Sequence, residues 1–473
     1  MCMRLTLPNG TKTFDALNDL LKNELFGVDL YEMDINVLKQ MLSVINIQFT
    51  LEGINRIQST LICEMKDSYV QQSQRYVALD SSDDVPYYIE HLGRRFGGTH
   101  EEREKHNTVL MNHMIPYVEE CIDLYNRMTK LKEESKSKGR PKIEDFEYGI
   151  PYEDARYVLP LCIKTNITVS CTADKLIDLF ELNNGGIMMD SIKKLFEDVL
   201  PGNFYKFCDY HGRTKELLDP KPYSTNSIDL KQEYVNRIFS EHHDNPIVQS
   251  GNMLRQIAVG ALTSTNSKNP VDIFTDKYCG NEGEAMRYIN RVLSYGHTGI
   301  LEQARHTYTG KISLSAYHQL IRHRLQNILR ESIDYICSTG VESFYVPESI
   351  KNSIFYDEYT SLLNKISYEI RHHSTSMTLP FMSQFLPNAT MIKVVISSNV
   401  KNDLWVMRER LCKTAQTEIR EFMNRYFLNV VDEYKEIYSK GLPPCALTNV
   451  CKEGKMTCGK ALEVRRQYEE YLK

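Results

Sequence analysis

Two distant stretches of the chain share one pattern of apolar and polar positions. Residues 45–77 and 304–336 align at a constant offset of 259. At this offset, similar side chains coincide: Phe49 with Tyr308, Leu61 with Leu320, Ile62 with Ile321, Ser73 with Ser332, and Tyr76 with Tyr335. Self-similarity over such a distance is the mark of an internal repeat. The pattern predicts that one structural element occurs twice.

A second pair of segments supports the duplication. Residues 152–180 and 382–407 align at an offset of 227, which places Leu159-Pro160 on Leu386-Pro387. After each Leu-Pro comes a β-branched run typical of a strand, and then a helical pattern. The offset is 32 residues shorter, so the first copy holds extra residues, which we place in the charged run Lys130–Asp145.

These patterns predict an α+β protein of two tandem modules, each a sheet packed with helices. The stretch around residues 200–245 is rich in Pro, Gly and Asn, which is typical of a linker. We place the boundary there, with copy one at residues 1–223 and copy two at residues 224–473. A chain of 473 residues is long enough for both modules to bury a core.

The overall charge argues against a general polyanion binder. There are 57 Lys and Arg against 62 Asp and Glu, a formal charge of −5, so no nucleic acid polymer is expected as a partner. No window has the apolar length that a bilayer requires, and the first residues do not resemble a signal peptide. We expect a soluble protein of the cytoplasm with no membrane partner, whose 12 cysteines are mostly reduced thiols.

The segment HQLIRHR, residues 318–324, concentrates positive charge within apolar surroundings. If it is helical, Gln319 and Arg322 share a face, whereas Arg324 points nearly the opposite way from Arg322. Such a helix would suit a position between two anionic ligands, or between one ligand and a carboxylate partner. The alternative is a pair of structural salt bridges on a buried helix.

Around this segment, the chain resembles the flavin-dependent thymidylate synthases. Their signature is an RHR followed by Ser-x-Arg-Tyr, and residues 296–324 are similar to its first part. Copy one contains the related stretches YVQQSQRYV (69–77) and EDARYVLP (153–160), and copy two contains RERLCKTAQTEIR (408–420). The resemblance implies two such modules docked as an internal pseudo-dimer.

The two copies retain complementary parts of the signature. Copy one keeps Ser73, Arg75 and Tyr76 but has Cys63, Glu64 and Met65 in place of RHR. Copy two keeps Arg322, His323 and Arg324 but has Asp334 where Arg75 would fall. The segments around the two Leu-Pro pairs divide in the same way. Copy one keeps Arg156, which aligns with Ser383 of copy two. Copy two keeps Asn399 and Arg410, which align with Thr172 and Asn183 of copy one.

By this resemblance, the residues expected at the site fall into three groups. The catalytic residues are Arg410 and Arg322. The FAD-binding residues are His297, Arg322, His323, Arg324, Asn399 and Lys401, with Lys401 where the family commonly has Arg. The nucleotide-binding residues are Gln319, Arg322, Arg410, Ser73, Arg75 and Arg156. These groups imply one composite site per chain, because the mirror site would oppose the phosphate with Asp334.

The implied reaction is the reductive methylation of a uridine nucleotide at C5. The substrate would be dUMP, with FAD as cofactor and methylene-tetrahydrofolate and NADPH as co-substrates, and two chains would form a homodimer. Two alternatives stay open: another pyrimidine nucleotide as substrate, or a non-catalytic flavin- or nucleotide-binding paralogue. Cys445, Cys451 and Cys458 lack the close spacing of zinc ligands, so no metal is expected. Trp405 is expected in the core.

Overall fold

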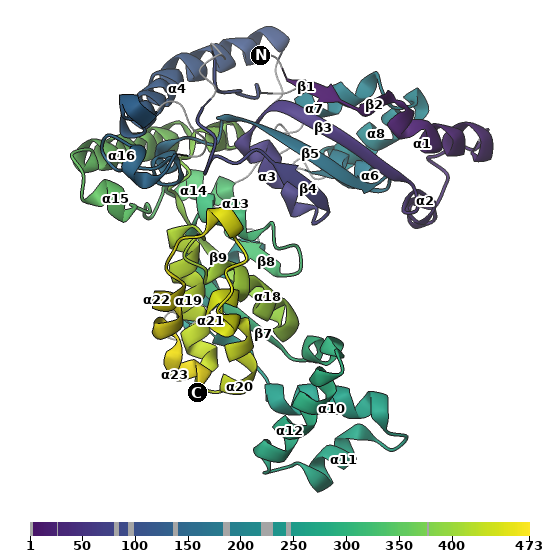
Figure 1. The fold of residues 1–473 in the computed structure, drawn as a ribbon. Helices are drawn as coiled ribbons and strands as arrows, with labels where there is room; N and C mark the ends of the chain where they lie inside the picture. The colour runs from purple at the N-terminus through teal and green to yellow at the C-terminus, as the bar shows by residue number, and fades with distance from the viewer. Residues whose placement is uncertain are drawn as a thin grey trace. The chain divides into compact units, whose positions relative to one another are not determined.

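The computed structural model describes residues 3–25, 27–79, 85–92, 99–135, 141–182, 190–218, 230–242, 247–375 and 378–473. The chain forms two compact units (Figure 1). Unit 1 holds residues 1–228, 313–318 and 332–391, and unit 2 holds residues 229–312, 319–331 and 392–473. The predicted boundary between the copies, at residues 223 and 224, lies outside the described residues.

Unit 1 is built around a four-stranded sheet in the order β1-β3-β5-β4. The strands are β1 (Arg4–Thr6), β3 (Asn46–Asn55), β5 (Lys164–Thr172) and β4 (Ser68–Gln71), and each neighbouring pair is antiparallel. A short strand β2 (Pro8–Thr11) follows β1. Phe49 of β3 meets Phe196 of α7 (Asp190–Glu197) edge to face, with ring centroids 5.2 Å apart. This aromatic contact belongs to the apolar core between the sheet and its helices.

Helices account for most of the rest of unit 1. From the first copy they are α1 (Asp15–Asp19), α2 (Ile35–Leu42), α3 (Arg56–Glu64), α4 (His100–Met128), α5 (Tyr152–Ala155), α6 (Lys175–Glu181), α7 (Asp190–Glu197) and α8 (Gly202–Leu218). From the second copy they are α14 (Ile333–Thr339), α15 (Glu348–Lys351), α16 (Tyr356–His373) and α17 (Leu379–Met382), with part of α13 (Leu314–Leu320). Capping boxes start both α3 and α4, so their N-termini are encoded locally.

Unit 2 contains a second four-stranded sheet, in the order β6-β7-β9-β8. Its strands are β6 (Ile247–Ser250), β7 (Arg305–Ser313), β9 (Met391–Asn399) and β8 (Asn327–Arg330). Its helices are α9 (Leu230–Glu241), α10 (Met253–Thr265), α11 (Pro270–Lys277), α12 (Glu282–Ser294), α18 (Val400–Arg410), α19 (Thr417–Val431), α20 (Lys435–Tyr438), α21 (Pro444–Thr448), α22 (Ala461–Gln467) and α23 (Glu469–Leu472). Val235 and Ile238 of α9 pack on Val395 of β9.

The two offsets found in the sequence carry elements of one copy onto elements of the other. An offset of 227 places β5 on β9 and α5 on α17 with identical bounds. An offset of 259 places β4 on β8 with identical bounds and brings the starts of β3 and β7 together. Because the two sheets also share their strand order, the predicted pair of α+β modules is confirmed.

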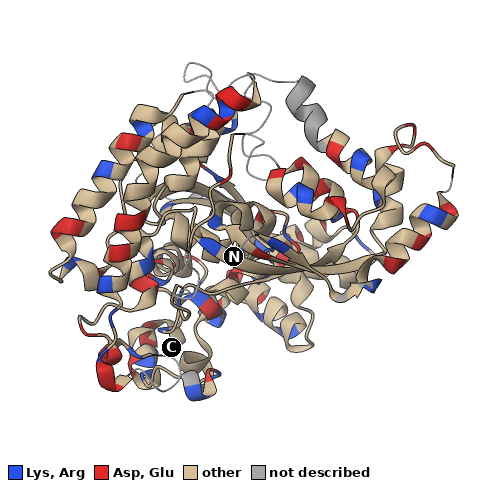
Figure 2. Cartoon of the chain, turned by 90° about the horizontal axis from the view of Figure 1, so that it is seen from above, with Lys and Arg blue, Asp and Glu red and all other residues tan. Residues whose placement is uncertain are grey.

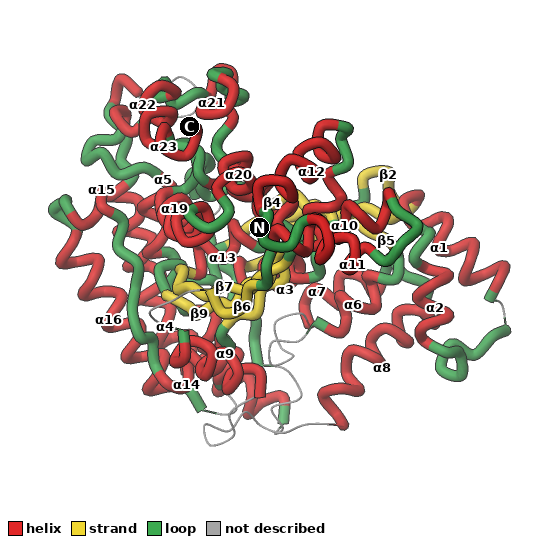
Figure 3. Tube along the Cα trace, turned by 90° about the horizontal axis from the view of Figure 1, so that it is seen from below, coloured by secondary structure: helices red, strands yellow, loops and turns green. Residues whose placement is uncertain are grey.

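Equivalent elements of the two copies meet inside unit 1. Pro160 and Pro387 form an isolated antiparallel bridge, and the Leu161 amide donates to the Leu386 carbonyl at 3.0 Å. The long helices α4 and α16 lie side by side (Figures 1 and 3). Arg56 of α3 donates from Nε to Nδ1 of His318 in α13 at 3.1 Å. Such pairing of like with like is the arrangement of an internal pseudo-dimer.

Charges of both signs are interspersed along the helices seen in Figure 2. This mixture agrees with the formal charge of −5, which is small for a chain of 473 residues. Among the described residues, no helix combines the length and the apolar character needed to cross a bilayer.

Candidate functional site

The cationic segment of copy two is a turn rather than a continuous helix. Helix α13 ends at Leu320, and residues 321–325 form turns that lead into β8. The condition of a helix through HQLIRHR therefore holds only as far as Leu320. The turn separates the three side chains of RHR, with Arg322 half-buried, His323 buried and Arg324 exposed. The three side chains still face different surroundings, because they follow one another along a turn and not because of their angles around a helix axis.

His323 contacts the arginine expected to act in catalysis. Arg410 is the last residue of α18, and its Nε donates to Nε2 of His323 at 2.6 Å. The ring of Trp405, on the same helix, meets His323 edge to face at 5.0 Å. Trp405 is 47% exposed, so its expected place in the core was wrong. The structure thus joins two motifs that lie 87 residues apart in the chain.

The buried position of His323 keeps its imidazole neutral. Burial, with the nearby charges of Arg410 and Arg322, lowers the pKa of His323 to about 3. A neutral imidazole has one N–H, and because Nε2 accepts from Arg410, that hydrogen belongs on Nδ1. Among the described residues, Nδ1 has no hydrogen-bond partner, although it is buried. A buried, unsatisfied N–H is a donor suited to an acceptor atom of a ligand.

A buried polar network holds the turn and α18 in place. Gln326, directly after the turn, donates from Nε2 to the Tyr308 hydroxyl at 3.1 Å and approaches Asp403 Oδ1 at 3.5 Å. Asp403, fully buried on α18, accepts from the Tyr426 hydroxyl at 2.9 Å and lies 2.7 Å from His306 Nε2. Sequence reasoning missed this network, whose only local signal is polar residues within apolar patterns. It orients the residues that would contact ligands.

Asn399 and Lys401 belong to the first turn of α18. Asn399 is buried and caps the helix, since its Oδ1 accepts from the Asn402 amide at 2.9 Å. Asn402 in turn donates to the Leu325 carbonyl at 3.1 Å and so ties this end of α18 to the cationic turn. Lys401 forms an exposed ion pair with Glu302 at 2.5 Å. All three side chains are therefore held near one end of one helix.

The other two residues expected on the flavin and nucleotide side differ in exposure. Gln319 is buried in the last turn of α13, with 5% of its surface exposed. His297 is exposed at the start of a 3₁₀ helix, Thr298–Gln303. The direct hydrogen bond among these site residues in unit 2 is the one from Arg410 to His323 described above.

In unit 1, the residues expected at the nucleotide phosphate converge on Glu153. Ser73 lies just beyond β4, where its hydroxyl accepts from the Arg75 amide at 3.3 Å. Arg75 forms a close ion pair with the Glu153 carboxylate. Arg156, only 2% exposed, donates from Nε to the Glu153 carbonyl at 3.2 Å. Glu153, which the sequence reasoning did not single out, brings both arginines together.

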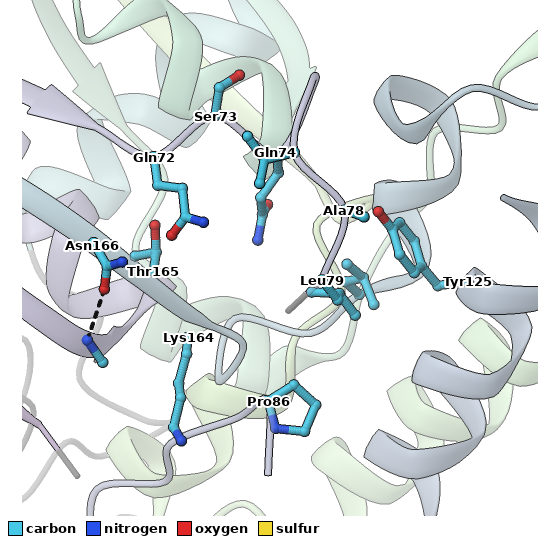
Figure 4. Close-up of a pocket in the computed structure, with 13 residues that line it drawn as sticks. Gln72, Ser73, Gln74, Ala78, Leu79, Pro86, Tyr125, Lys164, Thr165 and Asn166 are labelled. Carbon is cyan, nitrogen blue, oxygen red and sulfur yellow. Dashed lines mark hydrogen bonds between the residues drawn. The ribbon is translucent and has the colours of Figure 1, made fainter. Parts of the chain in front are cut away.

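A cavity of about 90 Å³ adjoins this group and includes Ser73 in its wall. Figure 4 shows Gln72 and Gln74 extending into the same space, across from Thr165. The amide nitrogen and oxygen of Gln74 and the hydroxyl of Thr165 are buried and have no hydrogen-bond partner among the described residues. Such groups are rare unless a water or ligand satisfies them. Neither residue was predicted from the sequence.

Comparisons with known proteins identify the family of this chain. A family model described as thymidylate synthase complementing protein matches residues 36–200 and 246–434. The chain belongs to this family. It is similar to the flavin-dependent thymidylate synthase of Clostridium tetani, with 29% identity over 40% of this chain and 82% of the relative. The enzyme of the same name from Geobacter sulfurreducens is 30% identical over 39% of this chain and 80% of the relative.

Membership in the thymidylate synthase complementing protein family confirms the predicted resemblance and the tandem duplication. The family model matches twice, and two-fifths of this chain suffices to cover four-fifths of a relative. The prediction of an enzyme of the flavin-dependent thymidylate synthase type is confirmed at the level of the family. A structure of a flavin-dependent thymidylate synthase from Helicobacter pylori with FAD and dUMP is similar more distantly, at 16% identity over 40% of this chain and 96% of that one, with a TM-score of 0.33.

Proposed function

We propose that this protein catalyses the reductive methylation of a uridine nucleotide at C5, converting dUMP to dTMP. FAD would be its cofactor, with methylene-tetrahydrofolate and NADPH as co-substrates. The observation that carries the proposal is the 2.6 Å hydrogen bond from Arg410 to His323, because it unites the two retained motifs of copy two. Family membership supplies the reaction type, and the side chains supply the roles proposed below.

Copy two would hold the flavin. Arg322, His323 and Arg324 come from the cationic turn, Asn399 and Lys401 from the start of α18, and His297 from the 3₁₀ helix before β7. The donor set fits FAD, since a diphosphate suits cationic side chains and the buried Nδ1–H of His323 suits a carbonyl or ring nitrogen. When bound, the flavin would supply the hydride.

Arg410, Arg322 and Gln319 would act on the pyrimidine. An arginine stays protonated at all relevant pH values. Arg410 is half-buried, and in a partly desolvated site a fixed cation stabilises developing negative charge more strongly than it does in water. Because the pKa of His323 is lowered to about 3, this neighbour brings no second positive charge to Arg410. Arg410 and Arg322 would therefore withdraw electron density from the uracil ring, and Gln319 would orient it.

Copy one would hold the phosphate and sugar of the nucleotide. Ser73, Arg75 and Arg156 are a hydroxyl and two guanidinium groups gathered by Glu153, a combination suited to an anion. Glu153 also neutralises part of their charge, which keeps the group stable without ligand. The unsatisfied amide of Gln74 and hydroxyl of Thr165 would accept further contacts in the adjoining cavity.

We further propose one composite site per chain, built from the retained parts of both copies. The support is the complementary pattern of losses. The reverse combination would offer Cys63, Glu64 and Met65 in place of the cationic turn, with Asp334 and Ser383 in place of the two arginines. Two carboxylates would then oppose the anionic nucleotide. Two chains would associate as a homodimer, and we place the enzyme in the cytoplasm.

The first experiment is an anaerobic assay with FAD, NADPH and methylene-tetrahydrofolate. The protein would be offered dUMP, UMP and dCMP separately, and the products would be identified by mass spectrometry. We expect dUMP to gain one methylene unit. A gain on UMP or dCMP instead would establish another pyrimidine nucleotide as substrate, and no gain with flavin retained would favour a binding paralogue.

A second experiment tests the composite site. Isothermal titration of the flavin-loaded protein with dUMP should give one nucleotide per chain. Two nucleotides per chain would contradict the proposal, because each copy would then hold its own site. Light scattering in the same buffer should give twice the chain mass of 55.0 kDa. A single-chain mass would disprove the homodimer without affecting the nucleotide count.

A further inference from the structure

We propose a transition-metal site, of the kind that takes Zn²⁺, formed in unit 1 by His113 of α4 with Glu369 and His373 of α16. One ligand comes from copy one and two come from copy two. It does not overlap with the residues proposed for the reaction. It also runs against the expectation that no metal is bound, which considered only the C-terminal cysteines.

The three side chains converge on one point. His113 Nε2 lies 2.7 Å from Glu369 Oε2, and His373 Nε2 lies 3.5 Å from the same oxygen. One ligand atom from each residue lies within 4.8 Å of the others. The two imidazole centroids are 4.3 Å apart. The 2.7 Å contact is a hydrogen bond, and a cation that replaced its proton would find two imidazole nitrogens and a carboxylate oxygen already gathered within 4.8 Å of one another.

The spacing on the two helices explains this convergence. Glu369 and His373 are four residues apart and so lie on one face of α16. His113 and Tyr117 have the same separation on α4, and the Tyr117 hydroxyl donates to Glu369 Oε1 at 3.3 Å. This second contact orients the carboxylate, as an outer hydrogen bond does in established zinc sites. The site is thus built from two rigid helices rather than from loops.

The donor set and the distances suit zinc. Two imidazoles and one carboxylate are the protein ligands of many zinc sites, which leave the fourth position to water or another molecule. With Zn–N distances of about 2.0–2.1 Å, tetrahedral ligand atoms lie roughly 3.4 Å apart, so the observed 2.7 and 3.5 Å need only small side-chain adjustments.

The side chains are accessible to an ion from solvent. The exposed fractions are 39% for His113, 17% for Glu369 and 31% for His373. A simple ion pair is the competing explanation, because a protonated His113 and the Glu369 carboxylate attract each other without a metal. The two explanations differ in one respect. An ion pair needs no metal, whereas a metal site responds to added Zn²⁺ and links α4 of one copy to α16 of the other.

Cobalt spectroscopy on the untagged full chain tests the proposal. Co²⁺ would be titrated into metal-free protein while visible absorption is followed, and Zn²⁺ would then be added as a competitor. We expect a tetrahedral or five-coordinate cobalt band at one ion per chain, removed by Zn²⁺. Zn²⁺ should also raise the melting temperature by several degrees. Absence of both the band and the shift would overturn the proposal.

Matched variants assign the ligands. His113→Ala, Glu369→Gln and His373→Ala should each weaken Co²⁺ binding at least about 10-fold. His106→Ala is the control, since His106 is exposed on the same helix α4 and its Nδ1 contacts only the Glu102 carbonyl in the described contacts. Glu369→Gln keeps the size of the side chain and one acceptor oxygen for the Tyr117 hydroxyl but removes the carboxylate charge, so it reports on metal binding even if His113→Ala fails to fold. Unchanged binding in Glu369→Gln and His373→Ala would overturn the assignment.

Discussion

The equivalent helices α3 and α13 end differently, although they begin at nearly equivalent positions. In copy one, α3 continues through Cys63 and Glu64, the positions that match Arg322 and His323. In copy two, α13 ends at Leu320, and the cationic residues occupy a turn. The surrounding sheets nevertheless have the same strand order. The two copies therefore keep the same strand order, although the equivalent segment is the end of a helix in copy one and a turn available to ligands in copy two.

Next to the two Leu-Pro pairs, copy one is the copy that keeps an arginine, and copy two has lost it. Arg156 and Ser383 occupy the same place in equivalent 3₁₀ turns, and both are buried. Arg156 contacts the Glu153 carbonyl, whereas the Ser383 hydroxyl donates to the Pro380 carbonyl at 2.7 Å. A serine satisfied by its own turn has no charge to offer a phosphate. Each copy has thus kept its backbone and lost a different part of the chemistry.

The largest effect is expected from Arg410→Gln, which removes a charge found in copy two alone. The amide can still donate to His323, but it cannot stabilise negative charge on the pyrimidine. We expect dTMP formation to fall by about 10²–10³-fold, as for loss of one fixed donor at a reacting group. Steady-state assays would measure this with flavin content checked by absorbance. Arg408→Ala, an exposed neighbour on α18, is the control and should keep its activity.

Arg75→Ala tests the phosphate side of the comparison. Losing a charge-assisted hydrogen bond costs about 1.5–3 kcal/mol, which corresponds to roughly 10–100-fold weaker dUMP binding. Bound FAD should be unchanged, because Arg75 is assigned to the nucleotide. Asp334→Asn, at the equivalent position of copy two, should leave the dUMP affinity as it is. Titration calorimetry would decide, and a loss of FAD in Arg75→Ala would contradict the division of roles.

The buried His323 predicts that the stability of the chain depends on pH. The pKa of His323 is about 3 in the folded chain and about 6.5 when unfolded. Below pH 6.5 the unfolded state binds the extra proton, so stability falls with falling pH. Between pH 6.5 and 5.5 this residue should cost about 1 kcal/mol. Urea unfolding of His323→Asn should show a correspondingly smaller loss; an identical loss would refute the neutral imidazole.

The smallest effect on stability is expected from Lys401→Ala. Lys401 and Glu302 are 43% and 46% exposed, and copy one has Asp174 at the equivalent position. An exposed ion pair contributes about 0–1 kcal/mol, so the free energy of unfolding should change by less than about 0.5 kcal/mol. FAD affinity, measured by fluorescence titration, should fall several-fold if Lys401 contacts the cofactor. Glu302→Gln removes the same ion pair and should keep FAD affinity.

The sequence by itself determined the repeated framework of this protein. Strands β5 and β9, and the short helices before them, coincide at the offset read from two Leu-Pro landmarks. This was predictable because strand alternation and turn residues are local properties of the chain. The choice of Ser73, Arg75, Arg156 and the RHR segment also came from the sequence, through its resemblance to the flavin-dependent thymidylate synthases.

Tertiary structure decided which of these residues meet. The turn after Leu320 leads into β8, whose Asn327 pairs with Ser397 of β9, a contact no local pattern encodes. The Arg410 to His323 bond, the exposure of Trp405 and the convergence of two arginines on Glu153 likewise depend on segments far apart in the chain. So does the folding of residues 332–391 with copy one. Such contacts join segments that are far apart in the chain, and they form only when sheets and helices pack around a shared apolar core, because each element must cover apolar surface of another.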